Sequence, residues 1–276
     1  VYWDNAGVNA VDLRYAVLED TGWAVEAIDT FNGVNDYERP SLALDAQGNP
    51  RVAFHAVGPS PLLYYRRDGG LWTSEVVDQW PLATCCEVPS LALDSQDNPH
   101  IAMYNFTGVA LRYARYDPIF GRWQKYNVYE QTGHVMPPGW PSLVIGLDDQ
   151  PRVAYFDTEA LQLRYFAFDG MQWVMEAPDP ASRRGQWSAL ALDPVGAPHI
   201  LYTAWIGTSA FIYHAWQVWP DGVPPSSSVD PIQPYWRTAP SLAVNATASD
   251  RGVGIANVTL WYRTSGNNAS WGPWAA

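Results

Sequence analysis

The 276-residue chain has few lysines, two cysteines and no long hydrophobic run. A membrane-spanning helix needs about eighteen consecutive apolar residues, and since the sequence contains no such run we expect no membrane insertion. Lys125 is its one lysine and the net charge is −12. A surface of that sign repels a phosphate backbone, so nucleic acid is not expected as a partner. The sequence also lacks helix-length stretches with apolar residues at helical spacing.

The two cysteines are adjacent in the sequence. Consecutive Cα atoms lie about 3.8 Å apart, which is shorter than the usual span of a disulfide. A bridge between Cys85 and Cys86 would therefore be strained, yet with no third cysteine an intramolecular disulfide can form only there. A bridged pair and two free thiols both stay open.

Aromatic residues, by contrast, make up 14% of the chain, and proline and glycine are abundant, which favours an all-β fold. The stretch "PSLALDAQGNPRVAF" at 40–54 returns in similar words at 89–103, 141–155 and 188–202. A serine marks each copy, at 41, 90, 142 and 188, with spacings of 49, 52 and 46. Two further landmarks keep the same phase, a tyrosine motif such as "LRY" and a later tryptophan. The tryptophans are Trp23, Trp72, Trp123, Trp173 and Trp219.

Each unit predicts four short strands separated by turn signals, which we call strands A to D. In the best-formed unit they are "SLALD", "RVAFH", "LLYYRR" and "WTSEVVD". Such a sheet is apolar on both faces and must be covered on both. A radial stack satisfies this requirement, so the sequence predicts a β-propeller of four-stranded blades.

The chain holds five repeat units, and five blades are the favoured number, closed by strands from both termini. A larger ring of six to eight blades, of which this chain is a part, is the alternative.

A family resemblance rests on the hairpin between strands C and D. Its D-G-x-x-W pattern, as in "DGGLW" and "DGMQW", resembles a degenerate Asp box of the sialidase-like propellers found in secreted bacterial and archaeal proteins. The resemblance covers residues 1 to about 222. The leading serine of the full motif is missing, so the resemblance bears more on fold than on activity.

The C-terminal stretch departs from the repeat. Residues 223–234, "VPPSSSVDPIQP", are rich in proline and serine and indicate a linker between a propeller at 1–222 and a last segment at 235–276. That segment contains "ASDRGVGIANVTLWYR", which resembles the opening of an immunoglobulin-like domain. The alternative is that "PSLAV" at 240–244 supplies strand A of the first blade.

Two kinds of loop are expected to crowd one face of the propeller, those joining B to C and those joining D to the next A. We call this the loop face, and it is where ligand binding is predicted. Its expected ligand-binding residues are Trp3, Asp4, Tyr37, His55, Trp80, Cys85, Cys86, Tyr104, Asn105, Trp140, Asp157, Trp187 and Trp205. Aromatic rings among charged groups suit carbohydrate, because the rings stack on sugars and the charged groups bind hydroxyls. Packing between blades is the competing explanation for each aromatic.

Catalysis of the sialidase type would need an arginine clamp, an acidic Asp and a Tyr activated by a Glu. The residues that could serve are Asp157, Tyr104, Glu38, Arg39, Arg183 and Arg184. No spacing ties them together.

These features are compatible with three functions: a carbohydrate-binding module without catalysis, a glycosidase or polysaccharide lyase on the same face, or an adhesin-like structural protein. We expect no cofactor and no metal, because His55, His100 and His134 form no ligand pattern. The "DSQDN" turn at 94–98 resembles half a calcium loop but is expected to be structural. Sequons at 105, 245, 257 and 268 indicate an extracellular or cell-surface protein, joined to other domains of a larger surface protein.

Overall fold

The structure is a computed structural model. It describes residues 1–7, 10–32, 39–55, 61–79, 88–105, 110–131, 140–181, 184–206, 209–217, 226–229 and 246–249. All regular secondary structure in these ranges is β-strand, and no helix long and apolar enough to cross a membrane occurs in them. The chain divides into two compact units, Val1–Gln217 and Val218–Ala276, and each is described separately.

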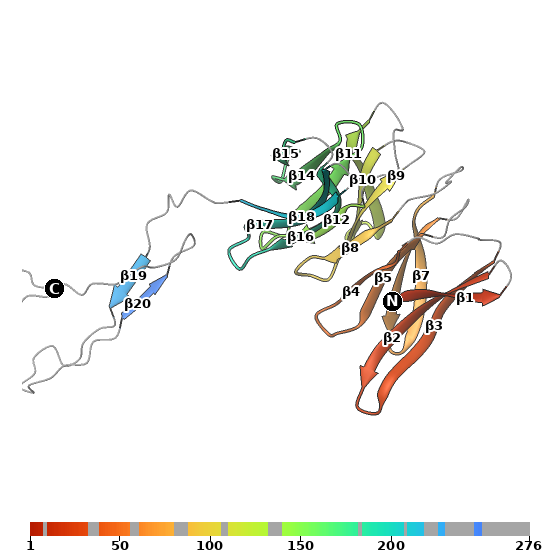
Figure 1. The fold of residues 1–276 in the computed structure, drawn as a ribbon. Coiled ribbons are helices and arrows are strands. Elements are labelled where there is room, and N and C mark those ends of the chain that lie inside the picture. Colours follow the sequence, from red (N-terminus) through yellow and green to blue (C-terminus); the bar gives the residue numbers. More distant parts are fainter. Residues whose placement is uncertain are drawn as a thin grey trace, which may run out of the picture. The chain divides into compact units, whose positions relative to one another are not determined.

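Five antiparallel sheets follow one another along the first unit (Figure 1). The first sheet contains β1 (Tyr2–Gly7), β2 (Ala10–Glu19) and β3 (Gly22–Asn32). The second contains β4 (Ser41–Leu44), β5 (Pro50–His55), β6 (Leu62–Asp68) and β7 (Leu71–Asp78). The third contains β8 (Ser90–Leu93), β9 (Pro99–Asn105), β10 (Ala110–Asp117) and β11 (Arg122–Glu130). The fourth contains β12 (Ser142–Ile145), β13 (Pro151–Asp157), β14 (Gln162–Phe168) and β15 (Trp173–Asp179). The fifth contains β16 (Arg184–Leu192), β17 (Pro198–Ile206) and β18 (Ser209–Trp216).

The predicted all-β architecture with four strands per unit is confirmed by the second, third and fourth sheets. Their strands pair in the order A, B, C, D along the chain. In the described residues, the first sheet has no strand A and the fifth has no strand D. In the part of the chain that the structure describes, no strand pairing joins the fifth sheet to the first. Five-bladed closure therefore stays a prediction.

The second unit contains one described strand pair, β19 (Ser226–Val229) with antiparallel β20 (Ala246–Ser249). β19 falls in the stretch expected as a linker and β20 in the expected immunoglobulin-like segment. The alternative strand, 240–244, lies outside the described residues. The domain boundaries and the immunoglobulin-like assignment stay predictions.

The hydrophobic core lies between consecutive sheets. Each buried cluster draws its residues from two neighbouring sheets: Leu13 of β2 packs with Phe54 of β5, and Leu62 of β6 with Met103 of β9. The same holds for the third with the fourth sheet and for the fourth with the fifth. Both faces of the inner sheets are buried in this way, and their apolar surface is removed from water. Each Å² of apolar surface buried stabilises the fold by roughly 25 cal/mol.

The tyrosine and tryptophan landmarks meet at these interfaces. The strand C tyrosine of one sheet contacts the strand D tryptophan of the next, edge to face, in three successive interfaces. The pairs are Tyr15–Trp72 at 5.7 Å, Tyr64–Trp123 at 5.5 Å and Tyr113–Trp173 at 5.2 Å between ring centroids. This geometry is favourable for aromatic pairs. The two landmarks recur in phase because each unit must supply one partner to each neighbour.

The serine landmark ties the A strands together. The Oγ atoms of Ser41, Ser90 and Ser142 each accept a hydrogen bond of 2.9 Å from a backbone N–H of the following sheet. The donors are Leu91, Leu143 and Leu190. We call these three the inter-sheet serines.

The fifth unit departs from the expected serine position. Ser41 pairs with Ala53 across its sheet, and the residue with the equivalent pairing in the fifth sheet is Ala189, opposite Leu201. The assignment of Ser188 to the landmark is therefore wrong by one residue. The sequence contains the same alignment, because "ALALD" at 189–193 matches "SLALD" at 41–45 and puts Ala189 in the position of Ser41.

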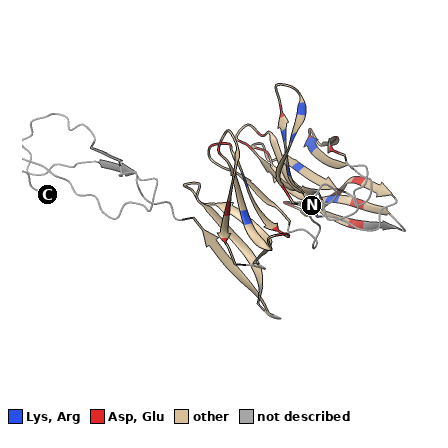
Figure 2. Ribbon diagram, turned by 90° about the horizontal axis from the view of Figure 1, so that it is seen from above, with Lys and Arg blue, Asp and Glu red and all other residues tan. Residues whose placement is uncertain are grey.

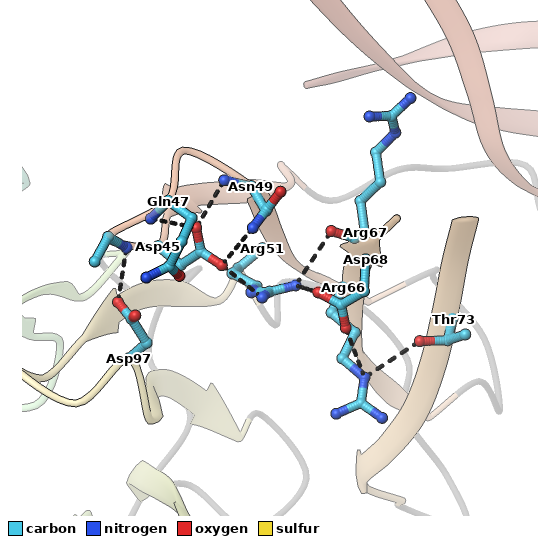
Figure 3. A network of polar contacts seen from close by, with 10 residues as sticks. Asp45, Gln47, Asn49, Arg51, Arg66, Arg67, Asp68, Thr73 and Asp97 are labelled. Carbon is cyan, nitrogen blue, oxygen red and sulfur yellow. Dashed lines mark hydrogen bonds and ion pairs between the residues drawn. The ribbon is translucent and has the colours of Figure 1, made fainter. Parts of the chain in front are cut away.

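The turns between strands A and B make a further connection between sheets. In the second sheet, Asp45 Oδ1 accepts hydrogen bonds from the backbone N–H groups of Gln47 and Asn49 (Figure 3). Asp97, from the turn of the third sheet, reaches across to accept the N–H of Ala46 at 2.9 Å (Figure 3). Asp149 of the fourth sheet accepts from Ser95 in the same way.

Asp97 and Asp149 both have a left-handed backbone, with φ of 62° and 56°. Aspartate tolerates this region better than most residues, and glycine, which occupies the equivalent position as Gly48 and Gly196, could not make the contact. The predicted structural role of the "DSQDN" turn agrees with these bonds.

Candidate functional site

Asp157 ends β13 at the turn between strands B and C, and its residue is fully buried, at 0% exposure. Its carboxylate is surrounded by donors. Oδ1 accepts from Gln131 Nε2 at 2.7 Å and from two backbone N–H groups of the following turn. Oδ2 accepts from Tyr129 Oη at 3.1 Å and from Arg164 Nε at 3.2 Å. Asp157 therefore organises the turn and ties it to the third sheet.

Tyr104 reaches the same network through Gln131. Its hydroxyl donates to Gln131 Oε1 at 3.2 Å, and its ring stacks on that of Tyr155 at 5.9 Å. Thr158 also donates to Gln131. The structure therefore brings Asp157 and Tyr104 together, but with a glutamine between them. Sequence reasoning missed Gln131, whose signal is its place directly after β11, at the start of a predicted loop-face connection.

The electrostatics of this network oppose acid or nucleophile chemistry. Burial raises the pKa of the Asp157 carboxyl, but the hydrogen bonds from Ala160, Arg164, Tyr129 and Gln131 outweigh it, and the pKa lies below its ordinary value. A general acid needs a raised pKa. Burial raises the pKa of Tyr104, whereas an activated tyrosine needs a lowered one.

A second group of predicted residues meets at the entry to the A strands. The Arg39 guanidinium carbon lies 3.9 Å from the centroid of the Trp140 ring. Trp140 in turn lies 6.5 Å from Trp187, centroid to centroid, at an angle of 54°. Arg39 belongs to the second sheet, Trp140 to the fourth and Trp187 to the fifth. Each lies shortly before the position that an inter-sheet serine occupies, which we call the tie position. Segments that are about fifty and a hundred residues apart in the sequence therefore meet here. We call these three residues the Arg39–Trp140–Trp187 cluster.

The register explains this convergence. Arg39, Trp140 and Trp187 each lie two residues before the position held by Ser41, Ser142 and Ala189 in their sheets. The third sheet has Val88 there, which is 6% exposed. Equivalent residues at the inner ends of successive A strands approach one another when the sheets are arranged around a common axis.

Trp187 has an unusual backbone. Its φ is +49° and it lies at the register irregularity of β16, with 52% of its surface exposed. A bulky residue in the left-handed region is rare and costs on the order of 1–3 kcal/mol. Gly185, two residues earlier, has φ +111°, and a Cβ there would lie 2.6 Å from Leu163 Cβ. Backbone strain of this kind is typical of functional positions.

The other residues considered in the sequence analysis fall into four sets. Trp3 and Asp4 lie on β1, where the Trp3 residue is 40% exposed and an Asp4 oxygen lies 3.5 Å from Arg14 Nε. His55, at the end of β5, is fully buried. For Asn105, Arg184 and Trp205 the structure describes only the backbone, in β9, β16 and β17. The residues outside the described ranges are Tyr37, Glu38, Trp80, Cys85, Cys86, His134 and Arg183.

Within the described residues, no cluster of three histidine, cysteine or acidic side chains could hold a metal ion. The carboxylate oxygens of the turn aspartates Asp45 and Asp94 are instead engaged by backbone and asparagine N–H groups.

Comparisons with known proteins support the fold. No protein-family model and no curated protein matches the sequence. Among solved structures, a triple arginine-to-alanine mutant of AofleA from Arthrobotrys oligospora superposes with a TM-score of 0.50 at 13% identity, over 75% of this chain and 67% of that chain. The fold is a β-propeller.

Two further structures are similar over parts of the chain. A mutant of the NanB sialidase from Streptococcus pneumoniae superposes with a TM-score of 0.47 at 13% identity, over 72% of this chain and 33% of that chain. A fucose lectin from Kordia zhangzhouensis, in complex with methyl-fucoside, superposes with a TM-score of 0.37 at 16% identity, over 50% of this chain and 98% of that chain.

Proposed function

We propose that this propeller is a carbohydrate-binding module without catalytic activity, which acts outside the cell or at its surface. It would be one domain of a larger surface protein, with an immunoglobulin-like neighbour as a spacer. The four sequons and the C-terminal phrase "ASDRGVGIANVTLWYR" support the location and the neighbour.

The Arg39–Trp140–Trp187 cluster carries the proposal. Trp187 presents an indole that is 52% exposed, and Trp140 lies beside it with Arg39 over its ring. Flat indole faces stack on the apolar face of a pyranose, and a guanidinium donates hydrogen bonds to hydroxyls. The left-handed backbone at Trp187 is strained, and strain of this kind is found most often at functional positions.

The buried network favours binding over catalysis. Asp157 and Tyr104 are the residues that sialidase-type chemistry would use, and both are nearly inaccessible to solvent, at 0% and 2% exposure. Their pKa values are shifted away from the directions that acid and nucleophile roles require. Their hydrogen bonds instead hold the third and fourth sheets together.

A glycan array tests the proposal. The wild-type chain should bind a subset of immobilised glycans. Trp187→Ala removes the stacking indole and should weaken the affinity for the best of these glycans about tenfold or more, which corresponds to a loss of ~1.4 kcal/mol of binding free energy. Trp140→Ala should act in the same direction. Trp23→Ala is the matched control, since Trp23 is 70% exposed at the C–D hairpin of the first sheet, which contributes no residue to the cluster, and its loss should leave binding unchanged.

Turnover separates binding from catalysis. The proposal fails if the chain cleaves sialyl or uronate substrates and Asp157→Asn or Tyr104→Phe abolishes that turnover. The absence of binding to every glycan on the array would instead favour the adhesin-like structural role.

A further inference from the structure

A cleft of about 710 Å³ opens between the third and fourth sheets, within the range of about 300–1,000 Å³ typical of small-molecule sites. It lies at the A–B turns and the C–D hairpins, whereas the Arg39–Trp140–Trp187 cluster lies where the loops enter the A strands. Residues from both sheets line it. The cleft is therefore a separate feature of the propeller.

Aromatic rings form one side of the cleft. Tyr113 contacts Trp173 edge to face at 5.2 Å and stacks on Tyr126 at 6.2 Å. Phe168 lies 5.5 Å from Trp173. Tyr126 is 41% exposed, so its ring is accessible from the cleft. The polar lining includes Asn98, Asn127, Gln150 and Gln172.

The first interface shows why this cleft is open. There, Glu26 accepts a hydrogen bond from Trp72 Nε1 at 3.1 Å and forms an ion pair with Arg67 at 2.8 Å. These contacts join the first and second sheets over the Tyr15–Trp72 pair.

At the third interface, the two positions equivalent to Glu26 and Arg67 hold other residues, so this ion pair cannot form. Tyr126 pairs with Tyr113 as Glu26 pairs with Tyr15, and Phe168 pairs with Trp173 as Arg67 pairs with Trp72. Rings therefore replace both members of the ion pair. The polar bridge is lost, and an aromatic surface remains.

The charge of the lining selects among ligands. Asp94, Asp117 and Asp149 contribute negative charge to the lining of the cleft. Among the described lining residues, Arg115 contributes the positive charge. An acidic surround disfavours carboxylated sugars by like-charge repulsion. Flat rings with amide groups at the rim favour a neutral ring with hydroxyls.

We propose that this cleft binds an uncharged pyranose unit, as a second saccharide site distinct from the Arg39–Trp140–Trp187 cluster. The ligand class rests on the proposed carbohydrate function, whereas the site rests on the cleft alone. Two sites on one propeller would let it engage two parts of a branched glycan, which raises avidity when both are reached at once.

The test uses the full chain with the first cluster removed by Trp140→Ala and Trp187→Ala. Saturation-transfer NMR titrations would use methyl α-D-mannoside, methyl β-D-galactoside and methyl α-L-fucoside as neutral probes, and methyl β-D-glucuronide as the anionic probe. We expect at least one neutral probe to bind and the glucuronide to bind at least tenfold more weakly. Adding Tyr126→Glu with Phe168→Arg, which copies the first interface, should abolish neutral-probe binding.

A milder variant guards against misfolding. Tyr126→Ala removes one exposed ring and should weaken the neutral probe about fivefold or more, while Tyr126→Phe keeps the ring and should bind as before. If no probe binds the doubly substituted background while the wild type still binds glycans, the cleft proposal is wrong and the proposed function stands. If probes bind this background unaffected by any Tyr126 change, the cleft proposal is also wrong. If the probes bind in the cleft and Trp140→Ala with Trp187→Ala leaves glycan binding at the wild-type level, the proposed role of the Arg39–Trp140–Trp187 cluster is wrong instead.

Discussion

Two neighbouring positions of the repeat differ in how much their residues vary from sheet to sheet. Ser41, Ser90 and Ser142 tie one A strand to the next, and Ala189 stands in that position in the fifth sheet. The position two residues earlier is Arg39, Val88, Trp140 or Trp187. The tie position thus holds serine in three of the four sheets that have it, whereas the earlier position differs from sheet to sheet.

The inter-sheet serines should each contribute measurably to stability. Ser90→Ala removes the acceptor for the Leu143 N–H and leaves that donor between two sheets, so unfolding should become easier by about 1 kcal/mol. Chemical denaturation monitored by tryptophan fluorescence measures this change.

Ser188→Ala is the matched control. Ser188 Oγ is buried, and the described residues provide no hydrogen-bond partner for it, so its loss should be neutral or slightly stabilising. Equal losses for Ser90→Ala and Ser188→Ala would contradict the role of the serine tie.

The A–B turn is an element that provides polar contacts both within and between sheets. Each turn carries an aspartate that accepts backbone N–H groups of its own turn, and Asp97 and Asp149 extend the contact to the preceding sheet. Arg51 adds an ion pair to Asp45 at 2.6 Å. Proline follows each turn and limits where strand B begins. These turns thus carry both local and inter-sheet bonds.

The turn carboxylates predict acid sensitivity. Burial raises the pKa of Asp45, but hydrogen bonds from Asn49 and the charge of Arg51 outweigh it, so its folded pKa lies below the unfolded value of about 4. Asp157 shows the same direction. A lowered folded pKa contributes stability that is complete above the unfolded pKa and is lost as the pH falls through the folded pKa.

Unfolding free energy should therefore decline as the pH falls below about 4. His100 adds a loss that begins near pH 6.5, because burial lowers the pKa of its imidazole and protonation then favours the unfolded chain. Denaturation midpoints measured from pH 7 to pH 3 check this, and Asp45→Asn should flatten the acidic part of the profile. A profile that is level across the range would contradict it.

The whole propeller is acidic, and its described basic residues are largely paired. Figure 2 shows acidic and basic positions interspersed along the strands of the first unit. Arg67 pairs with Glu26, Lys125 with Asp78 and Arg152 with Asp148. With a net charge of −12, no sizeable excess of positive charge is available to hold a polyanion.

The chain should therefore fail to bind heparin or duplex DNA. Retention on a heparin column at low ionic strength, where attraction is least screened, measures this. The control is a resin that carries a neutral glycan, and the proposed function predicts that this resin retains the protein. Salt-dependent elution from heparin would show a basic surface that the paired residues do not account for.

Much of the architecture follows from the repeat. Leu, Val and Tyr alternate so that both faces of each sheet are apolar, and a sheet of that kind must be covered on both sides. The landmarks recur in phase because Tyr64 must meet Trp123, and Tyr113 must meet Trp173. All-β sheets of four strands were therefore predictable from local pattern alone. The exception is Ser188, although the match of "ALALD" at 189–193 with "SLALD" at 41–45 marks Ala189 as the equivalent residue in the sequence as well.

The sites were predictable only in part, for a physical reason. The sequence indicated that Trp140 and Trp187 would lie on the loop face, because the loops' place in the repeat is a local property. That Arg39 lies over Trp140, and that Gln131 separates Tyr104 from Asp157, depends on how sheets distant in sequence pack together. The cleft beside Tyr126 and Phe168 has the same origin. A pattern along the chain determines what each sheet must bury, whereas the stacking of the sheets decides which side chains meet between them.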